Sequence, residues 1–141
     1  MFEAAALGRA ERLRGLLDAE PELAAAWSSD GFTALHLAAF FGTPDAARAL
    51  IDAGADVNAV ARNSMRVQPL HSAAAARRTK TARLLVERGA DVNARQEGGF
   101  APIHAAAQNG DADLVDLLVA AGADAEARTD DGKSAADFAA G

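Results

Sequence analysis

The six letters GADVNA stand at residues 54–59 and again at residues 89–94, and a divergent copy, GADAEA, stands at residues 122–127. A histidine precedes the glycine of each copy by 18 residues, at His36, His71 and His104. The text around the histidines, TALHLAAFFG, QPLHSAAAAR and APIHAAAQNG, aligns without gaps. Because both markers keep one register over spacings of 35 and 33 residues, the sequence indicates an internal repeat.

Each unit contains the start and stop signals of two short helices. Thr33 is expected to cap a first helix, which Gly42 breaks. A second helix starts with Pro44 at its first position and ends at Gly54, where a left-handed backbone is easily adopted. Residues 55–66 then lead out and back as a hairpin-like loop. Since one helix pair is too small to bury its apolar face alone, neighbouring pairs are expected to stack.

With a period near 33, a TALH start and a GADVNA close, the chain resembles the ankyrin-repeat family over essentially its whole length. The resemblance implies an all-α solenoid of stacked helix-turn-helix units joined by hairpin-like finger loops. It also implies a single domain, divided into an N-terminal capping repeat at 1–29, repeat 2 at 30–63, repeat 3 at 64–96, repeat 4 at 97–129 and a truncated C-terminal cap at 130–141. In the terminal units, Phe2 and Asp137 take the place of the histidine.

The sequence departs from the ankyrin pattern in three places. Repeat 3 has Arg77 where a helix-breaking glycine is expected, and a left-handed arginine costs about 1 kcal/mol. The finger between repeats 2 and 3, VARNSMRVQ at 60–68, is two residues longer than its successors. The first unit has Glu20-Pro21 in place of the closing glycine. The first two departures mark repeat 3 as unusual.

Length and composition favour one soluble domain. The chain has 141 residues, of which 50% are hydrophobic, and a formal net charge of −6. The acidic balance argues against nucleic acid as a partner, since phosphate binding requires an excess of lysine and arginine. No stretch has the composition of a signal peptide or a membrane span, and there is no cysteine. The sequence therefore predicts a cytoplasmic protein that does not associate with membranes and is monomeric.

The sequence gives no support for catalytic or metal chemistry. Stacked helices lie about 8–10 Å apart, so His36, His71 and His104 are expected to lie too far apart to share a zinc ion, and the resemblance implies that each bonds backbone near its own turn. Gly132-Lys133-Ser134 lacks the preceding glycine of a phosphate loop, and the acids at 111, 113 and 116 complement a helix N-terminus. We expect no catalytic residue, no metal and no cofactor.

The resemblance assigns surface positions to the end of each first helix and to the fingertips. Adjacent helical residues point about 100° apart, so Phe40 and Phe41 cannot both face the core. The two phenylalanines and the alanines of the next unit then form an apolar ridge and shelf. The candidate partner-binding residues are Phe32, Phe40, Phe41, Met65, Arg66, Val67, Ala75, Ala76, Arg77, Arg78, Phe100, Gln108 and Asn109. The alternative is one phenylalanine packed under a finger and the other exposed in isolation.

Charge is distributed in three bands along the chain. Residues 60–95 carry a formal charge of +6, between −5 for residues 1–59 and −7 for residues 96–141. One interpretation is weak attraction between neighbouring repeats, at under about 1 kcal/mol for each exposed pair. The other is a docking site for an acidic segment of a partner protein. Both remain open at the level of the sequence.

The function that these features favour is a non-catalytic protein–protein interaction module, which binds through its concave first-helix face and its finger loops. A structural or spacer domain with no specific ligand is one alternative. An engineered binder on a consensus scaffold is another, although GTPDAARAL, RRTKTARLL and GDADLVDLL differ at framework positions and so favour natural divergence.

Overall fold

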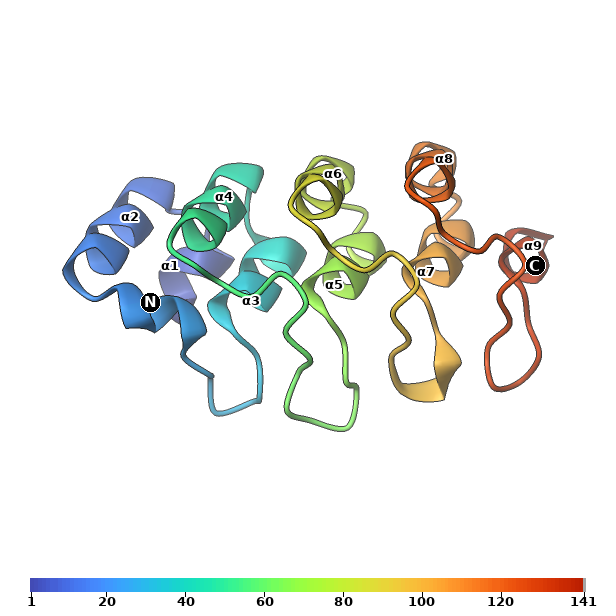
Figure 1. Cartoon of the computed structure of the whole chain (residues 1–141), viewed down its shortest axis with the longest axis horizontal. Coiled ribbons are helices and arrows are strands. Elements are labelled where there is room, and N and C mark those ends of the chain that lie inside the picture. Colours follow the sequence, from blue (N-terminus) through green and yellow to red (C-terminus); the bar gives the residue numbers. More distant parts are fainter. Residues whose placement is uncertain (141) are drawn as a thin grey trace.

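A computed structural model describes residues 1–140, and it arranges them as two rows of helices with a row of finger loops (Figure 1). The first helices lie side by side in the order α1 (Phe2–Ala6), α3 (Ala34–Phe41), α5 (Pro69–Ala75), α7 (Pro102–Gln108) and α9 (Ala135–Ala140). The second helices form the other row: α2 (Ala10–Ala19), α4 (Pro44–Asp52), α6 (Thr79–Glu87) and α8 (Ala112–Ala120). Short 3-10 segments cover Pro21–Ala25 (η1) and Glu97–Gly99 (η2). The predicted all-α solenoid is confirmed.

The helices begin where the sequence signals place them. The Thr33 hydroxyl accepts a hydrogen bond from the backbone N–H of His36 at 3.4 Å, and the Thr43 hydroxyl accepts one from Ala46 at 3.3 Å. Pro44 follows as the first residue of α4. These caps satisfy backbone N–H groups that have no partner within a helix.

The three histidines join each first helix to the finger loop that follows its helix pair. In repeat 2, Nδ1 of His36 accepts a hydrogen bond from the backbone N–H of Thr33 at 3.1 Å. Because Nδ1 is an acceptor, Nε2 carries the proton, and it donates to the carbonyl oxygen of Val67 at 2.9 Å. His71 bonds Gln68 and Ala94 in the same way, and His104 bonds Ala101 and Ala127. The predicted bond to each histidine's own turn is confirmed, whereas the bond to the following finger loop was not predicted from the sequence.

The asparagine of GADVNA also forms hydrogen bonds between neighbouring repeats. The Asn58 amide donates to the carbonyl oxygen of Gly89 at 3.1 Å, and its Oδ1 accepts from the N–H of Asp91 at 2.8 Å. Asn93 makes the same pair of bonds to Gly122 and Asp124. The repeated motif therefore joins each unit to the same motif in the next unit.

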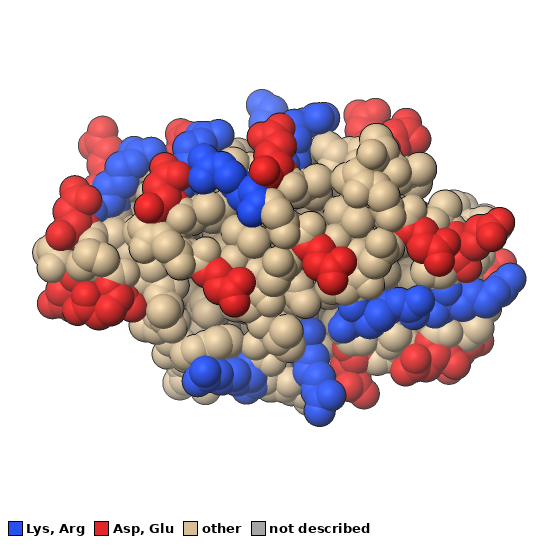
Figure 2. All heavy atoms as spheres, in the orientation of Figure 1, with Lys and Arg blue, Asp and Glu red and all other residues tan. Residues whose placement is uncertain are grey.

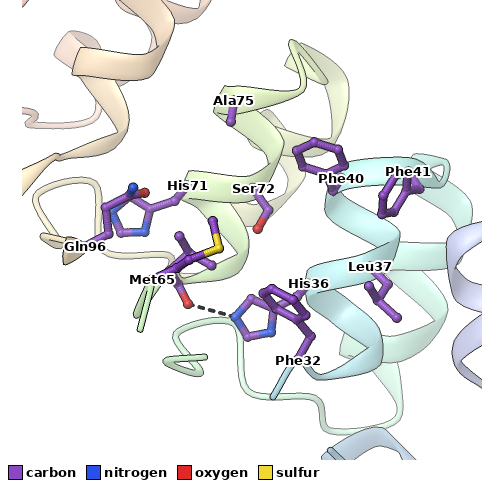
Figure 3. A pocket seen from close by; sticks show the side chains of 11 residues that line it. Phe32, His36, Leu37, Phe40, Phe41, Met65, His71, Ser72, Ala75 and Gln96 are labelled. Carbon is purple, nitrogen blue, oxygen red and sulfur yellow. Dashed lines mark hydrogen bonds between the residues drawn. The ribbon is translucent and has the colours of Figure 1, made fainter. Parts of the chain in front are cut away.

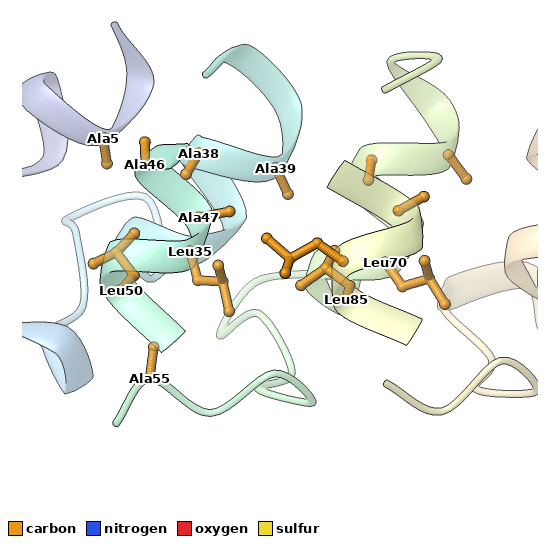
Figure 4. Packing of buried hydrophobic residues seen from close by; sticks show 14 of the residues in the cluster. Ala5, Leu35, Ala38, Ala39, Ala46, Ala47, Leu50, Ala55, Leu70 and Leu85 are labelled. Carbon is orange, nitrogen blue, oxygen red and sulfur yellow. The ribbon is translucent and has the colours of Figure 1, made fainter. Parts of the chain in front are cut away.

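The core is a double row of large aliphatic residues separated by alanines. Leu35, Leu70 and Ile103 are buried at one equivalent position of the first helices. Leu50, Leu85 and Leu118 are buried at one position of the second helices. Figure 4 shows several of these leucines with the alanines that lie between neighbouring helices. Burial of each such side chain contributes about 1.5–3 kcal/mol, and alanine allows the helices to approach closely.

The glycines that end the first helices serve two different purposes. Gly8 and Gly110 have left-handed backbones with φ of 69° and 68°, and Arg77 adopts the same conformation at φ 60°, as predicted. Gly42 does not, since its φ is −93°. A Cβ atom at Gly42 would lie 2.5 Å from the carbonyl oxygen of Ala5. Close approach to the preceding unit, rather than handedness, requires glycine there.

The long finger between repeats 2 and 3 differs from the others in its turn. Three fingers close with a backbone N–H bonded to the carbonyl oxygen four residues later: Ser28 to Phe32, Gln96 to Phe100, and Thr129 to Lys133. In the long finger, Ala61 bonds Val67 instead, six residues later at 2.8 Å. The two extra residues therefore lie inside this turn, where Arg66 has a left-handed backbone with φ 53°.

Candidate functional site

An apolar groove lies between repeats 2 and 3, where α3 and α5 run beside each other above the long finger (Figure 3). Its cavity has a volume of about 270 Å³. The lining comes from the finger residues Phe32, Met65, Val67 and Gln96, the α3 residues His36, Leu37, Phe40 and Phe41, and the α5 residues His71, Ser72 and Ala75.

Phe40 and Phe41 both reach solvent at the edge of this groove, with 39% and 57% of their surface exposed. Their rings meet edge to face with centroids 4.7 Å apart. Figure 3 shows Phe40 directed toward α5 near Ala75 and Phe41 on the other side of α3 with Leu37. Edge-to-face contact holds two aromatic rings in a defined arrangement. Both side chains line the cavity, and neither ring is buried in the helix stack.

The groove exists because α5 has small residues where α3 has large ones. Ala75 occupies the position, four residues after the histidine, that Phe40 occupies in α3. Ser72 likewise stands where α3 has Leu37. Because α5 has smaller side chains than α3 at equivalent positions of the repeat, a space remains beside α5.

The finger side of the groove is formed by Met65, which is 51% exposed. It lies within the enlarged turn, and its carbonyl oxygen accepts a hydrogen bond from the N–H of Glu97 in the next finger at 3.0 Å. The backbone is thus anchored while the thioether side chain remains free. An unbranched methionine adapts readily to the shape of a partner surface.

The floor of the groove carries no charge at neutral pH. His36 and His71 are buried there, and burial lowers the pKa of each imidazole below its usual value near 6.5. Both ring nitrogens of each histidine are already hydrogen-bonded to backbone. The surface is therefore suited to an uncharged apolar group and offers no free imidazole nitrogen for acid–base chemistry.

The structure brings six predicted residues together around this groove: Phe32, Phe40, Phe41, Met65, Val67 and Ala75. The prediction for Val67 was wrong in one respect. Only 5% of Val67 is exposed, because its carbonyl oxygen accepts the Nε2 hydrogen bond of His36 and draws the residue inward. Val67 thus contributes to the floor and is not a fingertip. Ala76 is half-buried and does not line the cavity.

Phe100, Asn109 and Gln108 do not line the cavity either. The Phe100 ring packs against Phe138 at a centroid distance of 5.7 Å and belongs to the contact between repeat 4 and the C-terminal cap. The Asn109 amide donates to the carbonyl oxygens of Ala74 and Ala75, each at 3.1 Å, and so caps the end of α5. Gln108 is exposed on α7 and does not border the cavity.

Five lining residues were not predicted from the sequence as partner-binding: His36, Leu37, His71, Ser72 and Gln96. The predicted positions were the last residues of each first helix and the fingertips, whereas Leu37 and Ser72 stand one residue after the histidine. Reading that column of the repeat gives Leu37, Ser72 and Ala105, a series that already shows the change in size between units. Gln96 carried no distinguishing signal.

Four of the eight basic side chains in residues 60–95 interact with other residues of the protein. Arg88 forms an ion pair with Asp52 at 3.0 Å, and Arg78 donates from Nε to the carbonyl oxygen of Phe40 at 3.1 Å. The Arg62 guanidinium lies 4.1 Å from the centre of the Trp27 ring, and Arg95 donates to the carbonyl oxygens of Gly99 and Arg128. Figure 2 shows basic and acidic side chains intermixed along the row of second helices. Attraction between neighbouring repeats thus accounts for part of the band.

The other half of the band has no such partner. Within residues 1–140, no ion pair or side-chain hydrogen bond is formed by Arg66, Arg77, Lys80 or Arg83. Arg66 belongs to the long finger and directly follows Met65, whereas Arg77 follows the groove-lining end of α5 by two residues. These two free guanidinium groups are therefore carried by segments at opposite ends of the groove.

Over the described part of the chain, no group of three or more His, Cys, Asp and Glu side chains is placed to hold a metal ion. None of the helices in residues 1–140 has both the length and the apolar character to cross a membrane.

Comparison with protein families agrees with this geometry. A family model described as ankyrin repeats (3 copies) matches residues 1–96, and one described as ankyrin repeats (many copies) matches residues 85–139. The chain therefore belongs to the ankyrin-repeat family. Ankyrin repeats are generally protein-interaction modules and are typically not enzymes. A search of curated proteins finds no match to this chain.

Proposed function

We propose that this protein is a non-catalytic module that binds a partner protein in the groove between repeats 2 and 3. The observation that carries the proposal is the grouping of exposed apolar side chains. The described residues include six large hydrophobic side chains that are exposed, and Phe40, Phe41 and Met65 among them line one cavity. Isolated exposed hydrophobic residues are ordinary, whereas a contiguous patch is typical of an interaction surface.

The construction of the groove also supports binding. Both sides of the groove belong to elements that hydrogen bonds hold in place. Thr33 caps α3, and the Met65 carbonyl oxygen accepts a hydrogen bond from the N–H of Glu97 in the next finger. A partner would then bind a preformed surface, which limits the ordering entropy lost on association. The remaining exposed large hydrophobic residues, Leu7, Val60 and Val119, do not line the cavity.

Two features favour binding over catalysis. The titratable groups that line the groove are His36 and His71, and backbone groups occupy all four of their ring nitrogens. A nucleophile with an adjacent base is not found among the groove residues, since the Ser72 hydroxyl has no hydrogen bond to either ring. The groove therefore offers an adhesive surface and no set of reacting groups.

An affinity pull-down with the intact protein, compared with the Phe40→Ala/Phe41→Ala variant, tests the proposed function. Proteins bound through the groove are retained by the natural chain and lost by the variant. Val119→Ala is the matched control, because it removes an exposed apolar side chain of α8 that does not line the cavity. A protein that passes this comparison is then purified and its binding to the three chains measured directly. Equal retention by all three chains would contradict the proposal.

A further inference from the structure

We infer that the occupant of the groove is an extended peptide segment of the partner, with one large apolar side chain and an acidic residue close to it on either side. This inference rests on the proposed function and specifies the chemistry of the ligand. It follows from the size of the cavity, from its neutral floor and from the arginines at its two ends.

The volume of the cavity is suited to one large apolar side chain of a partner. Pockets for drug-sized ligands hold about 300–1,000 Å³ and enclose most of the ligand. The present cavity, at about 270 Å³, lies just below that range, and the exposed side chains of Phe40 and Met65 are among its lining residues. One leucine, methionine or aromatic side chain therefore fits between the phenylalanine wall and Ala75. A buried anchor of this kind usually dominates the energetics of an interface.

The environment of the cavity excludes a charged anchor. Its walls are aromatic and aliphatic, and the two histidines of its floor are neutral at pH 7. A carboxylate or ammonium group placed there would lose its hydration without gaining an opposite charge. The charges of the bound segment must therefore lie outside the cavity, at its ends.

Both ends carry positive charge. Arg66 adjoins Met65 on the finger, and Arg77 follows the end of α5. Neither has an ion-pair partner within residues 1–140, although Glu97 borders the same shallow hollow as Arg66. The terminal nitrogens of Arg78 also form no hydrogen bond in that range, since only its Nε bonds Phe40. Such uncompensated guanidinium groups favour carboxylates of a partner and repel a basic segment.

The spacing of these charges defines the segment. Arg66 lies three residues before the start of α5 and Arg77 two residues after its end, and the seven-residue helix between them is about 10 Å long. An extended chain covers roughly that distance in three residues. The acidic residues are therefore expected within about two positions of the apolar anchor. Because the whole chain has a net charge of −6, selection for acidic ligands must come from these local arginines.

The test uses the 141-residue chain, immobilised and screened against a phage-displayed library of random dodecapeptides. Enriched peptides should contain a Leu, Met, Phe or Trp with Asp or Glu within two positions. The strongest peptide is then synthesised, and its affinity is measured by titration calorimetry at low and at high salt. The binding should weaken with salt, because exposed charges are screened over about 8–10 Å.

Variants separate the anchor from the charges. Ala75→Phe places in α5 the residue that α3 already has at this position, and it should fill the groove and reduce affinity at least tenfold. Since Ala75 is exposed, this change removes no buried contact, and circular dichroism should show an intact fold. Arg66→Gln/Arg77→Gln should reduce affinity severalfold and flatten the salt dependence. Arg83→Gln on α6, which neutralises a free arginine that does not line the groove, should leave affinity within twofold.

Each result bears on one level of the proposal. Enrichment of apolar peptides without acidic residues, or equal loss with Arg83→Gln, overturns the acidic segment while the groove remains a binding site. Enriched peptides whose affinity survives Ala75→Phe overturn the groove itself, and with it the proposed function. A library that yields no peptide overturns the short segment as ligand, whereas a partner lost with Phe40→Ala/Phe41→Ala in the pull-down still upholds protein binding.

Discussion

The Arg78 side chain of repeat 3 donates a hydrogen bond from Nε to the backbone carbonyl oxygen of Phe40 in repeat 2, over 3.1 Å. The carbonyl groups at the end of a helix have no partner within the helix, and this arginine supplies one for α3. Asn109 does the same for α5 from the following repeat. One unit thus completes the helix of its predecessor, and in repeat 2 the completed end carries the groove-lining phenylalanines.

Replacement of Arg78 by alanine should therefore lower stability. A hydrogen bond of a charged donor contributes about 1.5–3 kcal/mol at best, and exposure of this arginine reduces the effect to about 1 kcal/mol. Arg83→Ala, on the exposed face of α6, should change the free energy of unfolding by less than about 0.5 kcal/mol. Urea unfolding of both variants measures the difference. Equal effects would mean that the bond to Phe40 contributes nothing.

Two glycine-to-alanine changes should have opposite signs. At Gly42 the added Cβ would lie 2.5 Å from the carbonyl oxygen of Ala5, so the two units must separate, at a cost of about 1–3 kcal/mol. Gly15 lies inside α2, where an added Cβ atom would meet no other part of the protein within 4 Å, and alanine there should stabilise the chain by about 0.5–1 kcal/mol. Urea unfolding again provides the comparison. A neutral Gly42→Ala would show that α1 and α3 adjust without strain.

Arg77→Gly should stabilise the protein, because a left-handed backbone at φ 60° suits glycine better than arginine. The expected gain is about 0.5–1 kcal/mol. Arg83→Gly is the matched control: it makes the same chemical change inside α6 and should destabilise by about 1 kcal/mol. Thermal unfolding of the two variants measures both effects. If both melt below the natural chain, the backbone at Arg77 is not strained.

The sequence predicted the fold closely because the repeat supplies each structural signal several times. Thr33, Pro44 and Gly54 act through local backbone preferences, which are the same in the sequence and in the folded chain. Arg77 was predicted to be left-handed from its register alone, and it is. The reason for a glycine at position 42 was not predicted, because glycine is required there by the close approach of Ala5 from another unit.

The candidate site was predicted less completely, because a groove depends on differences between units. The Phe40–Phe41 and Ala75 positions were identified from single columns of the repeat, and both line the cavity. Val67 was misplaced because the position of the two extra residues within the long finger is decided by the bond from Ala61, which no local signal reveals. The use of Asn109 as a cap likewise depends on contact with the preceding unit.

Stability should decrease as the solution is acidified through the histidine range. Burial lowers the pKa of His36 and His71 in the folded chain, where backbone hydrogen bonds oppose part of this effect. In the unfolded chain both imidazoles titrate near their usual pKa of about 6.5. As pH falls below that value, the unfolded state therefore binds protons that the folded state does not, and the free energy of unfolding decreases. The stabilisation from the neutral histidines is fully present above about pH 7, and its loss levels off below the folded pKa values.

Urea unfolding between pH 8 and pH 5 measures the trend, in a range above the usual carboxylate pKa values. NMR titration of the imidazole protons assigns it to individual residues, and His36→Gln/His71→Gln should flatten the profile. A free energy of unfolding that is constant or rises from pH 7.5 to pH 5.5 would show that the two buried rings are not linked to folding in this way.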